Sequence, residues 1–328
     1  MRRRRRARPR AIPPPGGAPL GAPAASVPPG GAPAAPGAAA LGLSATDRAL
    51  LDLVGRHPFL TAGRLAAFAG RPPAATRRRL DRLVAVGLLR RVGPQEAPAV
   101  PGVHGLAELT LAGLRLVAAQ QGLPLGAAVR ANGLAGGGPD TPVGARRTLL
   151  WRLAHTVGAD GVFVGLAAGA RRGAAGRDGA LLEWRGAAAC ARGGVRPDGY
   201  GLYRHDGRLY GFFLEYDRGT MRAGEYRAKF AAYHEQWARG RFEREYDGLP
   251  TILVVTSGPG PERRMAEAVA AVGVGRDPPL PVLLTTTGRI AADRRGLLGP
   301  IWREPGGGPR RRWPVPGGGP GPGAPTGR

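Results

Sequence analysis

Residues 72–92, with the sequence PPAATRRRLDRLVAVGLLRRV, decide the fold of the first third of this chain. Proline is tolerated in the first turn of a helix, so the Pro-Pro pair opens a helix over residues 74–86, and Gly87 closes it. At about 100° per residue, one face of this helix is apolar and the opposite face is basic. The apolar face carries Leu80, Leu83 and Val84, and the basic face carries Arg78 and Arg82 flanked by Arg77 and Arg79. The segment therefore predicts a helix with a buried face and a positive stripe, followed by a strand at 88–92.

The residues on either side of this segment complete a small domain, which we place at residues 44–121. Two helices precede the segment, at 47–55 and 61–69, and a second strand and a closing helix follow it, at 106–110 and 111–120. Three short helices, a β-hairpin and a closing helix are the elements of a winged helix-turn-helix. We therefore predict a winged helix-turn-helix domain.

Helix-turn-helix proteins bring their recognition helix into the major groove of double-stranded DNA, where arginine contacts phosphate and guanine. The candidate DNA-binding residues are Arg77, Arg78 and Arg82 on the helix and Arg90 and Arg91 on the hairpin. The net charge of +25 and the pI of about 11.7 favour a polyanionic partner. A high-GC genome would also enrich Arg, and the alternative is a basic face that contacts another protein.

A second folded unit is predicted at residues 148–303, after a Gly/Pro/Ala-rich linker at 122–147. Its elements follow the order helix, three strands, helix, strand, helix, strand. The helices are expected at 149–172, 223–239 and 261–272, and the strands at 180–185, 199–204, 208–216, 250–256 and 281–287. We thus expect an α+β protein, in which the winged helix-turn-helix precedes an α/β domain with a mixed central sheet.

The two ends of the chain are poor in residues that could form a core. Residues 1–43 and 304–328 consist mainly of Arg, Pro, Gly and Ala, so we expect two disordered tails. Cys190 is the only cysteine, which excludes an internal disulfide framework and a cysteine-based zinc site. Neither a signal peptide nor a run of about 18 apolar residues is evident, so we expect a cytoplasmic protein without a membrane segment.

Three carboxylates belong to the predicted strands at 199–204 and 208–216. Glu215 and Asp217 are two residues apart and share a face, and antiparallel pairing brings Asp198 beside them. Such carboxylates repel one another unless a positive charge lies among them, and Mg²⁺ or Mn²⁺ prefers oxygen ligands. We expect these three residues to bind a divalent metal. Alternatively, Asp198 is a turn residue and the other two form ion pairs with neighbouring arginines.

Lys229 is the only lysine among 48 Lys and Arg residues. Its compact ammonium cannot be replaced by a guanidinium at a site that needs a small cation beside a phosphate. Because it follows the strand of Glu215, we predict a catalytic set of Asp198, Glu215 and Lys229. Burial against nearby tyrosines explains its retention equally well.

Four other residues are weaker candidates for function. His155 has no second His or Cys nearby and is interpreted as a core or interface residue. Trp184 and Trp237 are interpreted as packing residues, and Glu183 as a candidate fourth carboxylate.

The element order and the carboxylates resemble the PD-(D/E)XK nuclease superfamily. Its members have an α-β-β-β-α-β core, with Pro-Asp opening one strand and acid-x-Lys on the next. Asp198 and Glu215 match this pattern, whereas Asp217 stands at the position of the lysine. Some members carry that lysine on the following helix, which would suit Lys229. The resemblance implies a metal-dependent DNA nickase or endonuclease.

More specifically, the chain resembles the replication-relaxation family of plasmid and actinobacterial mobile-element proteins over about residues 44–290. The most specific match is the Leu-Glu-x-Asp-Arg-Gly-Thr motif at 214–220. Further matches are Phe59-Leu60-Thr61, residues 78–89, Glu108-Leu109-Thr110, His155, Arg196-Pro197-Asp198 and residues 229–233. The resemblance implies an accessory protein of plasmid or mobile-element replication and DNA relaxation, with DNA and replication or conjugation proteins as partners. The alternative is a non-catalytic, DNA-tethered regulator or scaffold that recruits a relaxase or coupling ATPase.

Overall fold

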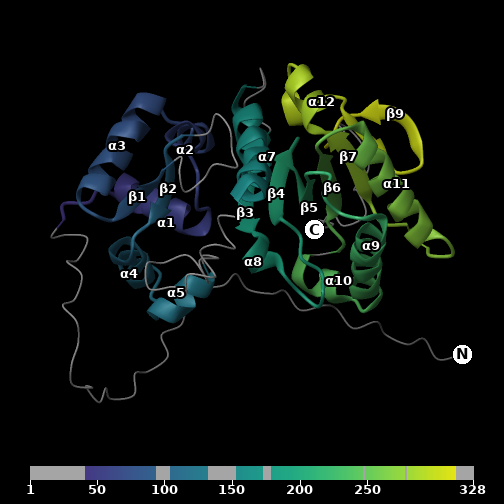
Figure 1. The fold of residues 1–328 in the computed structure, drawn as a ribbon, viewed down its shortest axis with the longest axis horizontal. Helices are drawn as coiled ribbons and strands as arrows, with labels where there is room; N and C mark the ends of the chain where they lie inside the picture. Colours follow the sequence, from purple (N-terminus) through teal and green to yellow (C-terminus); the bar gives the residue numbers. More distant parts are fainter. Residues whose placement is uncertain are drawn as a thin grey trace, which may run out of the picture. The chain divides into compact units, whose positions relative to one another are not determined.

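The computed structural model describes residues 41–93, 104–131, 153–172, 179–246, 248–277 and 279–314 (Figure 1). Its N-terminal elements follow the predicted order of three helices, a two-stranded antiparallel hairpin and a closing helix. These elements are α1 (Ala45–Arg56), α2 (Ala62–Ala69), α3 (Pro73–Ala85), β1 (Leu89–Val92), β2 (Leu106–Leu109) and α4 (Leu111–Gln120). Each agrees with its predicted range to within two residues at either end.

Local sequence signals explain where these helices begin and end. Ser44, Thr61 and Thr110 cap α1, α2 and α4, because each side-chain oxygen accepts a hydrogen bond from a backbone N–H of the first turn. Gly70 ends α2 with a φ of 63°, a conformation that glycine adopts without strain. Gly113 lets α4 approach the hairpin, since a Cβ there would lie 2.1 Å from the carbonyl oxygen of Leu88.

A mixed seven-stranded sheet forms the centre of the C-terminal region, with its strands in sequence order from β3 to β9. The sheet is antiparallel from β3 to β5 and parallel from β5 to β7, and the last two pairs are again antiparallel. Its strands are β3 (Gly179–Gly186), β4 (Gly199–His205), β5 (Arg208–Asp217), β6 (Thr251–Thr256), β7 (Val282–Thr286), β8 (Trp302–Glu304) and β9 (Gly307–Arg311). The mixed α+β architecture predicted from the sequence is confirmed.

Helices cover both faces of this sheet, and the alternation of buried side chains along β6 shows how. Leu253 and Val255 pack in the cluster that contains α7 (Leu153–Arg172). Ile252 and Val254 pack in the cluster that contains α9 (Ala223–Ala238) and α11 (Pro259–Gly273). Shorter helices are α5 (Leu125–Ala131), α8 (Ala187–Cys190), α10 (Arg241–Tyr246), α12 (Thr287–Ala292) and the 3₁₀ helix η1 (Gly296–Leu298).

Among the described residues, α7 is the one helix long and apolar enough to cross a membrane by length and composition. More than half of it is buried, and its apolar residues lie in the same cluster as those of α2 and β5. It therefore packs as a core helix.

The N-terminal helices and the sheet share one hydrophobic core, and the described residues belong to a single compact unit. A row of stacked rings crosses the two regions. His57 of the loop after α1 stacks on Trp184 of β3, with ring centroids 3.5 Å apart, and Trp184 stacks on Phe163 of α7. Phe163 in turn contacts Phe212 of β5, and that ring contacts Trp313. Trp184 is thus a packing residue, as expected.

The division into two domains separated by a linker at 122–147 stays a prediction. Part of that range is helical, because α5 lies within it, and residues 132–147 lie outside the described residues. The predicted N-terminal tail also lies outside them up to residue 40.

The chain remains ordered beyond residue 304, where we expected a disordered tail to begin. Residues 304–314 contain the end of β8 and all of β9, and residues 315–328 lie outside the described part. Two long-range interactions explain the order. Arg310 donates two hydrogen bonds of 2.9 Å to the buried carboxylate of Glu262 on α11, and Trp313 is only 4% exposed. Composition alone could not reveal either partner.

Candidate functional site

The carboxyl end of β5 carries two of the three predicted carboxylates on one face of the sheet. Glu215 and Asp217 both contact α9, as the period of two along a strand requires. Tyr216 lies between them on the other face, where its ring meets that of His155 on α7. The α9 helix follows β5 directly in the chain, so the two elements form one local unit.

Glu215 is fully enclosed by donors from α9. Its Oε1 accepts a 2.7 Å hydrogen bond from the hydroxyl of Tyr233, and its Oε2 accepts one from Nζ of Lys229. Burial raises the pKa of Glu215 to about 7, although the ammonium of Lys229 opposes this. Burial alone would lower the pKa of Lys229, but the carboxylates of Glu215 and Asp198 raise it, so the lysine carries a charge. The structure thus brings together Glu215 and Lys229, as the sequence predicted.

Asp198 precedes β4 and is held against the end of β5. Its backbone N–H donates to the carbonyl of Leu214, and its Oδ2 accepts a 2.8 Å hydrogen bond from the N–H of Tyr216. Its Oδ1 lies 2.8 Å from Nε2 of His155. His155 is therefore a member of this site, which sequence analysis had placed in the core or at an interface. No sequence pattern links α7 to the start of β4; only the folded sheet brings them together.

Asp217 faces the same region but has a different partner. Its Oδ2 accepts a 2.7 Å hydrogen bond from the hydroxyl of Tyr226, and the residue is 5% exposed. Its Oδ1 has no hydrogen-bond partner among the described residues. Tyr226 and Tyr233, noted in the sequence only as neighbours of Lys229, therefore each hold one carboxylate of β5.

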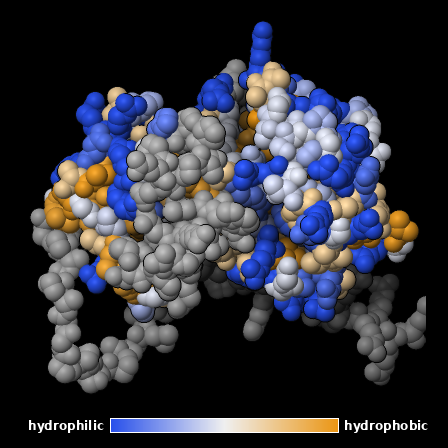
Figure 2. Space-filling view, in the orientation of Figure 1, coloured by the Kyte–Doolittle hydropathy of each residue, from blue (hydrophilic) through white to orange (hydrophobic). Residues whose placement is uncertain are grey.

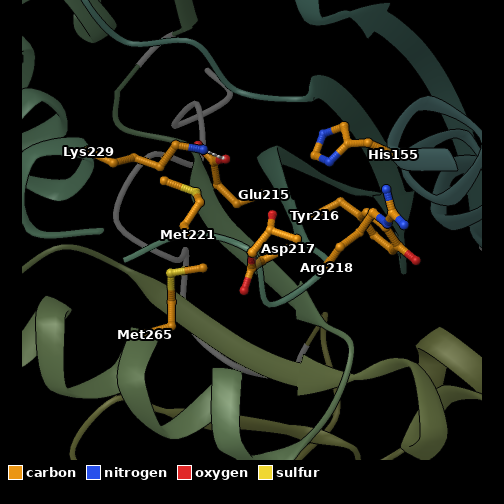
Figure 3. Close-up of a pocket in the computed structure, with 9 residues that line it drawn as sticks. His155, Glu215, Tyr216, Asp217, Arg218, Met221, Lys229 and Met265 are labelled. Atoms are coloured by element: carbon orange, nitrogen blue, oxygen red, sulfur yellow. Dashed lines mark hydrogen bonds and ion pairs between the residues drawn. The ribbon is translucent and has the colours of Figure 1, made fainter. Parts of the chain in front are cut away.

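A cavity of about 120 Å³ opens beside these side chains (Figure 3). Its lining combines acidic, basic and apolar groups from β5, α7, α9 and α11. The lining residues are His155, Glu215, Tyr216, Asp217, Arg218, Thr220, Met221, Lys229 and Met265. Two of the three predicted carboxylates, Glu215 and Asp217, thus border one cavity together with the single lysine, whereas Asp198 is not among its lining residues.

Protein donors engage two of the three predicted metal ligands in this structure. Both oxygens of Asp198 and both of Glu215 already face a protein donor, and Lys229 supplies the positive charge beside them. Within the described part of the chain, no three His, Cys, Asp or Glu side chains lie close enough to hold a metal. Binding of Mg²⁺ or Mn²⁺ at Asp198, Glu215 and Asp217 stays a prediction.

The candidate DNA-binding arginines fall into two groups. Arg77 and Arg78 of α3 are exposed and have no acidic partner among the described residues, and hydrophilic side chains gather over α3 in Figure 2. The other three have partners within the chain: Arg82 donates to the carbonyl of Gly42, Arg90 pairs with the buried Glu108, and Arg91 pairs with Asp81. The buried face of α3 is as predicted, since Leu80 and Leu83 are fully buried.

An open groove of about 650 Å³ lies beside α3. The start of α2, the middle of α3 and the hairpin form its walls. Its lining residues are Thr61, Ala62, Gly63, Arg64, Arg77, Asp81, Arg91, His104 and Gly105. Asp81 is the single acid among them and is paired with Arg91, so the groove is positively charged.

Glu183 does not join the acidic site. It pairs with Arg185 of the same strand at 2.5 Å. The charge of Glu183 is therefore balanced by its neighbour Arg185 and not by groups of the acidic site.

Comparison with known proteins places the chain in a family. The family model described as replication-relaxation matches residues 51–252, well over half of the chain, and the match includes α3, β5 and Lys229. No curated protein and no solved structure shows significant similarity to the chain. The chain therefore belongs to the replication-relaxation family, which suggests a role in the replication or relaxation of mobile elements.

Proposed function

We propose that the protein is a DNA-binding accessory factor of plasmid or mobile-element replication, and that α3 enters the major groove of duplex DNA. The observation that carries this proposal is the pair Arg77 and Arg78, exposed and without acidic partners in the described part of the chain. Arginine side chains so placed are free to contact phosphate or guanine. Family membership adds support, because replication and relaxation are processes that act on DNA.

The backbone around α3 supports the winged helix hypothesis. Leu60, between α1 and α2, forms an antiparallel bridge with Ala107 of β2, so a short extended segment flanks the hairpin. Phe59 is held in place by a 2.8 Å hydrogen bond from its N–H to the same residue. The resulting groove beside α3 carries His104 as a further candidate for phosphate contacts, and Arg64, which also lines it, donates to the carbonyl of Val157.

The test compares DNA affinity across arginine variants of the full chain. The double variant Arg77→Ala/Arg78→Ala should lose at least about tenfold in affinity for duplex DNA, because a base contact by arginine contributes roughly 1–3 kcal/mol. Its salt dependence should also become less steep. Arg115→Ala is the matched control, since Arg115 is equally exposed but lies on α4. Unchanged affinity of the double variant, or an equal loss in the control, would refute the proposal.

The nuclease-like hypothesis is a second candidate. Apart from the short helices α8 and α10, the order α7, β3, β4, β5, α9, β6 is the one expected of an α-β-β-β-α-β core, and Asp198, Glu215 and Lys229 lie together at the end of β5, which supports this candidate. Supercoiled plasmid incubated with the protein and Mg²⁺ or Mn²⁺ should then become nicked, and Asp198→Asn should abolish nicking. If the plasmid stays intact with both metals, the non-catalytic regulator or scaffold is the better explanation.

A further inference from the structure

The cavity at the end of β5 has a lining that neither DNA binding by α3 nor metal chemistry requires. We propose that this cavity holds one unpaired nucleotide of DNA, with its base against Met221 and Met265. This inference rests on the proposed DNA-binding function and specifies which DNA structure the protein prefers. Three properties of the lining support it.

The first property is the placement of the methionines. The chain has three methionines, and the two internal ones both line this cavity, from the loop after β5 and from α11. Figure 3 draws Met221 and Met265 on the same side of Asp217. Thioethers are polarizable and make favourable contacts with ring systems. The core of this chain consists mainly of Leu, Val and Ala. Two methionines at one cavity therefore form a polarizable wall that suits a flat ring.

The second property is a carboxylate oxygen at the cavity that is open to a ligand. Asp217 is 5% exposed, and its Oδ1 has no partner among the described residues, whereas Oδ2 is bound by Tyr226. This oxygen is not among the buried atoms that lack a partner, so it is accessible and can accept a hydrogen bond from a ligand donor. The ring N–H or exocyclic amine of a nucleobase is such a donor, and the hydroxyl of Thr220 on the same lining can contact a second polar atom of the base.

The third property is the positive charge at the cavity. Arg218 is exposed and has no acidic partner in the described part of the chain. Lys229 uses one of its three protons on Glu215, which leaves two for another acceptor. A nucleotide can make all of these contacts at once. Its phosphate can pair with the two cations, and its base can donate to Asp217 and pack against the methionines.

The size of the cavity agrees with such a ligand. Its volume of about 120 Å³ is several times the roughly 10–15 Å³ that one buried water requires. It is also well below the roughly 300–1,000 Å³ of pockets for larger ligands. The space suits a single base rather than a stacked pair.

The experiment measures affinity for three fluorescent duplexes that share one sequence. One is blunt, one carries a short single-stranded overhang, and one carries an abasic overhang of equal length. The full-length protein should bind the duplex with the normal overhang at least about fivefold more tightly than the other two. Contact with one base contributes roughly 1–3 kcal/mol to binding, which corresponds to about fivefold or more in affinity. The abasic duplex separates recognition of the base from attraction of the phosphate.

Two variants of Met221 test whether the cavity is responsible. Met221→Trp fills the cavity and Met221→Ala removes a thioether, so both should lose the preference for the overhang while keeping affinity for the blunt duplex. Val274→Trp and Val274→Ala are matched controls, because Val274 is 81% exposed at the end of α11. If M221W loses blunt-duplex binding as well, the Ala variant decides the question.

The outcomes distinguish this inference from the proposed function. Equal affinity for the overhang and the blunt duplex, or equal affinity for the normal and abasic overhangs, overturns the nucleotide site and leaves DNA binding by α3 intact. A preference that persists in Met221→Ala also overturns it. No binding of the blunt duplex by the wild-type protein refutes the proposed function itself.

Discussion

Acidification should loosen the contact between the N-terminal helices and the sheet through one buried histidine. His57 is 3% exposed and stacks on Trp184. Burial, with the nearby charge of Arg56 adding to it, lowers the pKa of His57 from 6.5 to about 3. The unfolded chain therefore binds a proton near pH 6.5, whereas the folded chain does not bind it until about pH 3.

The sign and size of the effect follow from this difference. Above pH 6.5 both states hold a neutral imidazole, so His57 leaves the free energy of unfolding unchanged. As the pH falls below 6.5, only the unfolded state takes up the proton, and the contribution of His57 to the free energy of unfolding falls by about 1.4 kcal/mol per pH unit. Between pH 7 and pH 5 this amounts to a loss of about 2 kcal/mol.

Urea denaturation at pH 7, 6 and 5 measures this loss, and the comparison with His57→Phe isolates it. Phenylalanine keeps a ring against Trp184 but cannot titrate, so the variant should lack the contribution of His57 to the pH dependence. Other groups titrate equally in both proteins and cancel in the difference. If the wild type and the variant lose the same free energy between pH 7 and pH 5, then His57 is protonated in the folded state and the reasoning is wrong.

Three further predictions concern stability and can be checked by urea or thermal denaturation. Glu262→Gln should lower the free energy of unfolding by about 3–5 kcal/mol, because it removes the charge that two arginines of the C-terminal strands share. The control Glu267→Gln, in an exposed ion pair, should lower it by less than about 1 kcal/mol. Similar losses in the two variants would contradict the ordered C-terminal strands. Asp160 is buried, which raises its pKa to about 8, so its own contribution to stability should fall as the pH rises from about 4 to 8, and the difference in stability between the wild type and Asp160→Asn should follow that fall. A wild type and variant with the same pH profile would show that the carboxyl is solvated. Gly158→Ala should lower the free energy of unfolding by about 1–3 kcal/mol, because the new Cβ would lie 2.3 Å from a tyrosine ring on β5. The control Gly224→Ala should not destabilise α9, since no atom lies within 4 Å of the new Cβ. An unchanged stability of Gly158→Ala would contradict the close packing of α7 on the sheet.

The elements that sequence analysis predicted well are those whose signals are local. The alternation of leucine and arginine along α3 and the predicted strands at 199–204 and 208–216, which the structure joins through the turn at Asp206 and Gly207, each depend on neighbouring residues. Both residues of that turn have positive φ, which Asp and Gly tolerate best. Glu215 and Lys229 were also predicted together, because the strand and the following helix are adjacent in the chain.

The features that the sequence could not supply depend on contacts between distant segments. His155 and Asp198 meet because α7 packs on the sheet, and neither residue has a neighbour that signals the other. The C-terminal strands have the composition of a disordered segment, and Glu262 and Arg310 become partners only in the folded protein. The core shared through His57 and Trp184 likewise depends on tertiary packing.

The row of stacked rings from His57 to Trp313 has a consequence for the order in which the protein matures. Its five members come from the loop after α1, α7, β3, β5 and the segment after β9, so they span nearly the whole described chain. A ribosome releases these segments one after another, and the last ring leaves it only when synthesis is almost complete. The rings that join the N-terminal helices to the sheet are therefore all made by residue 212, whereas the last ring, Trp313, covers Phe212 only after the C-terminal strands have been made.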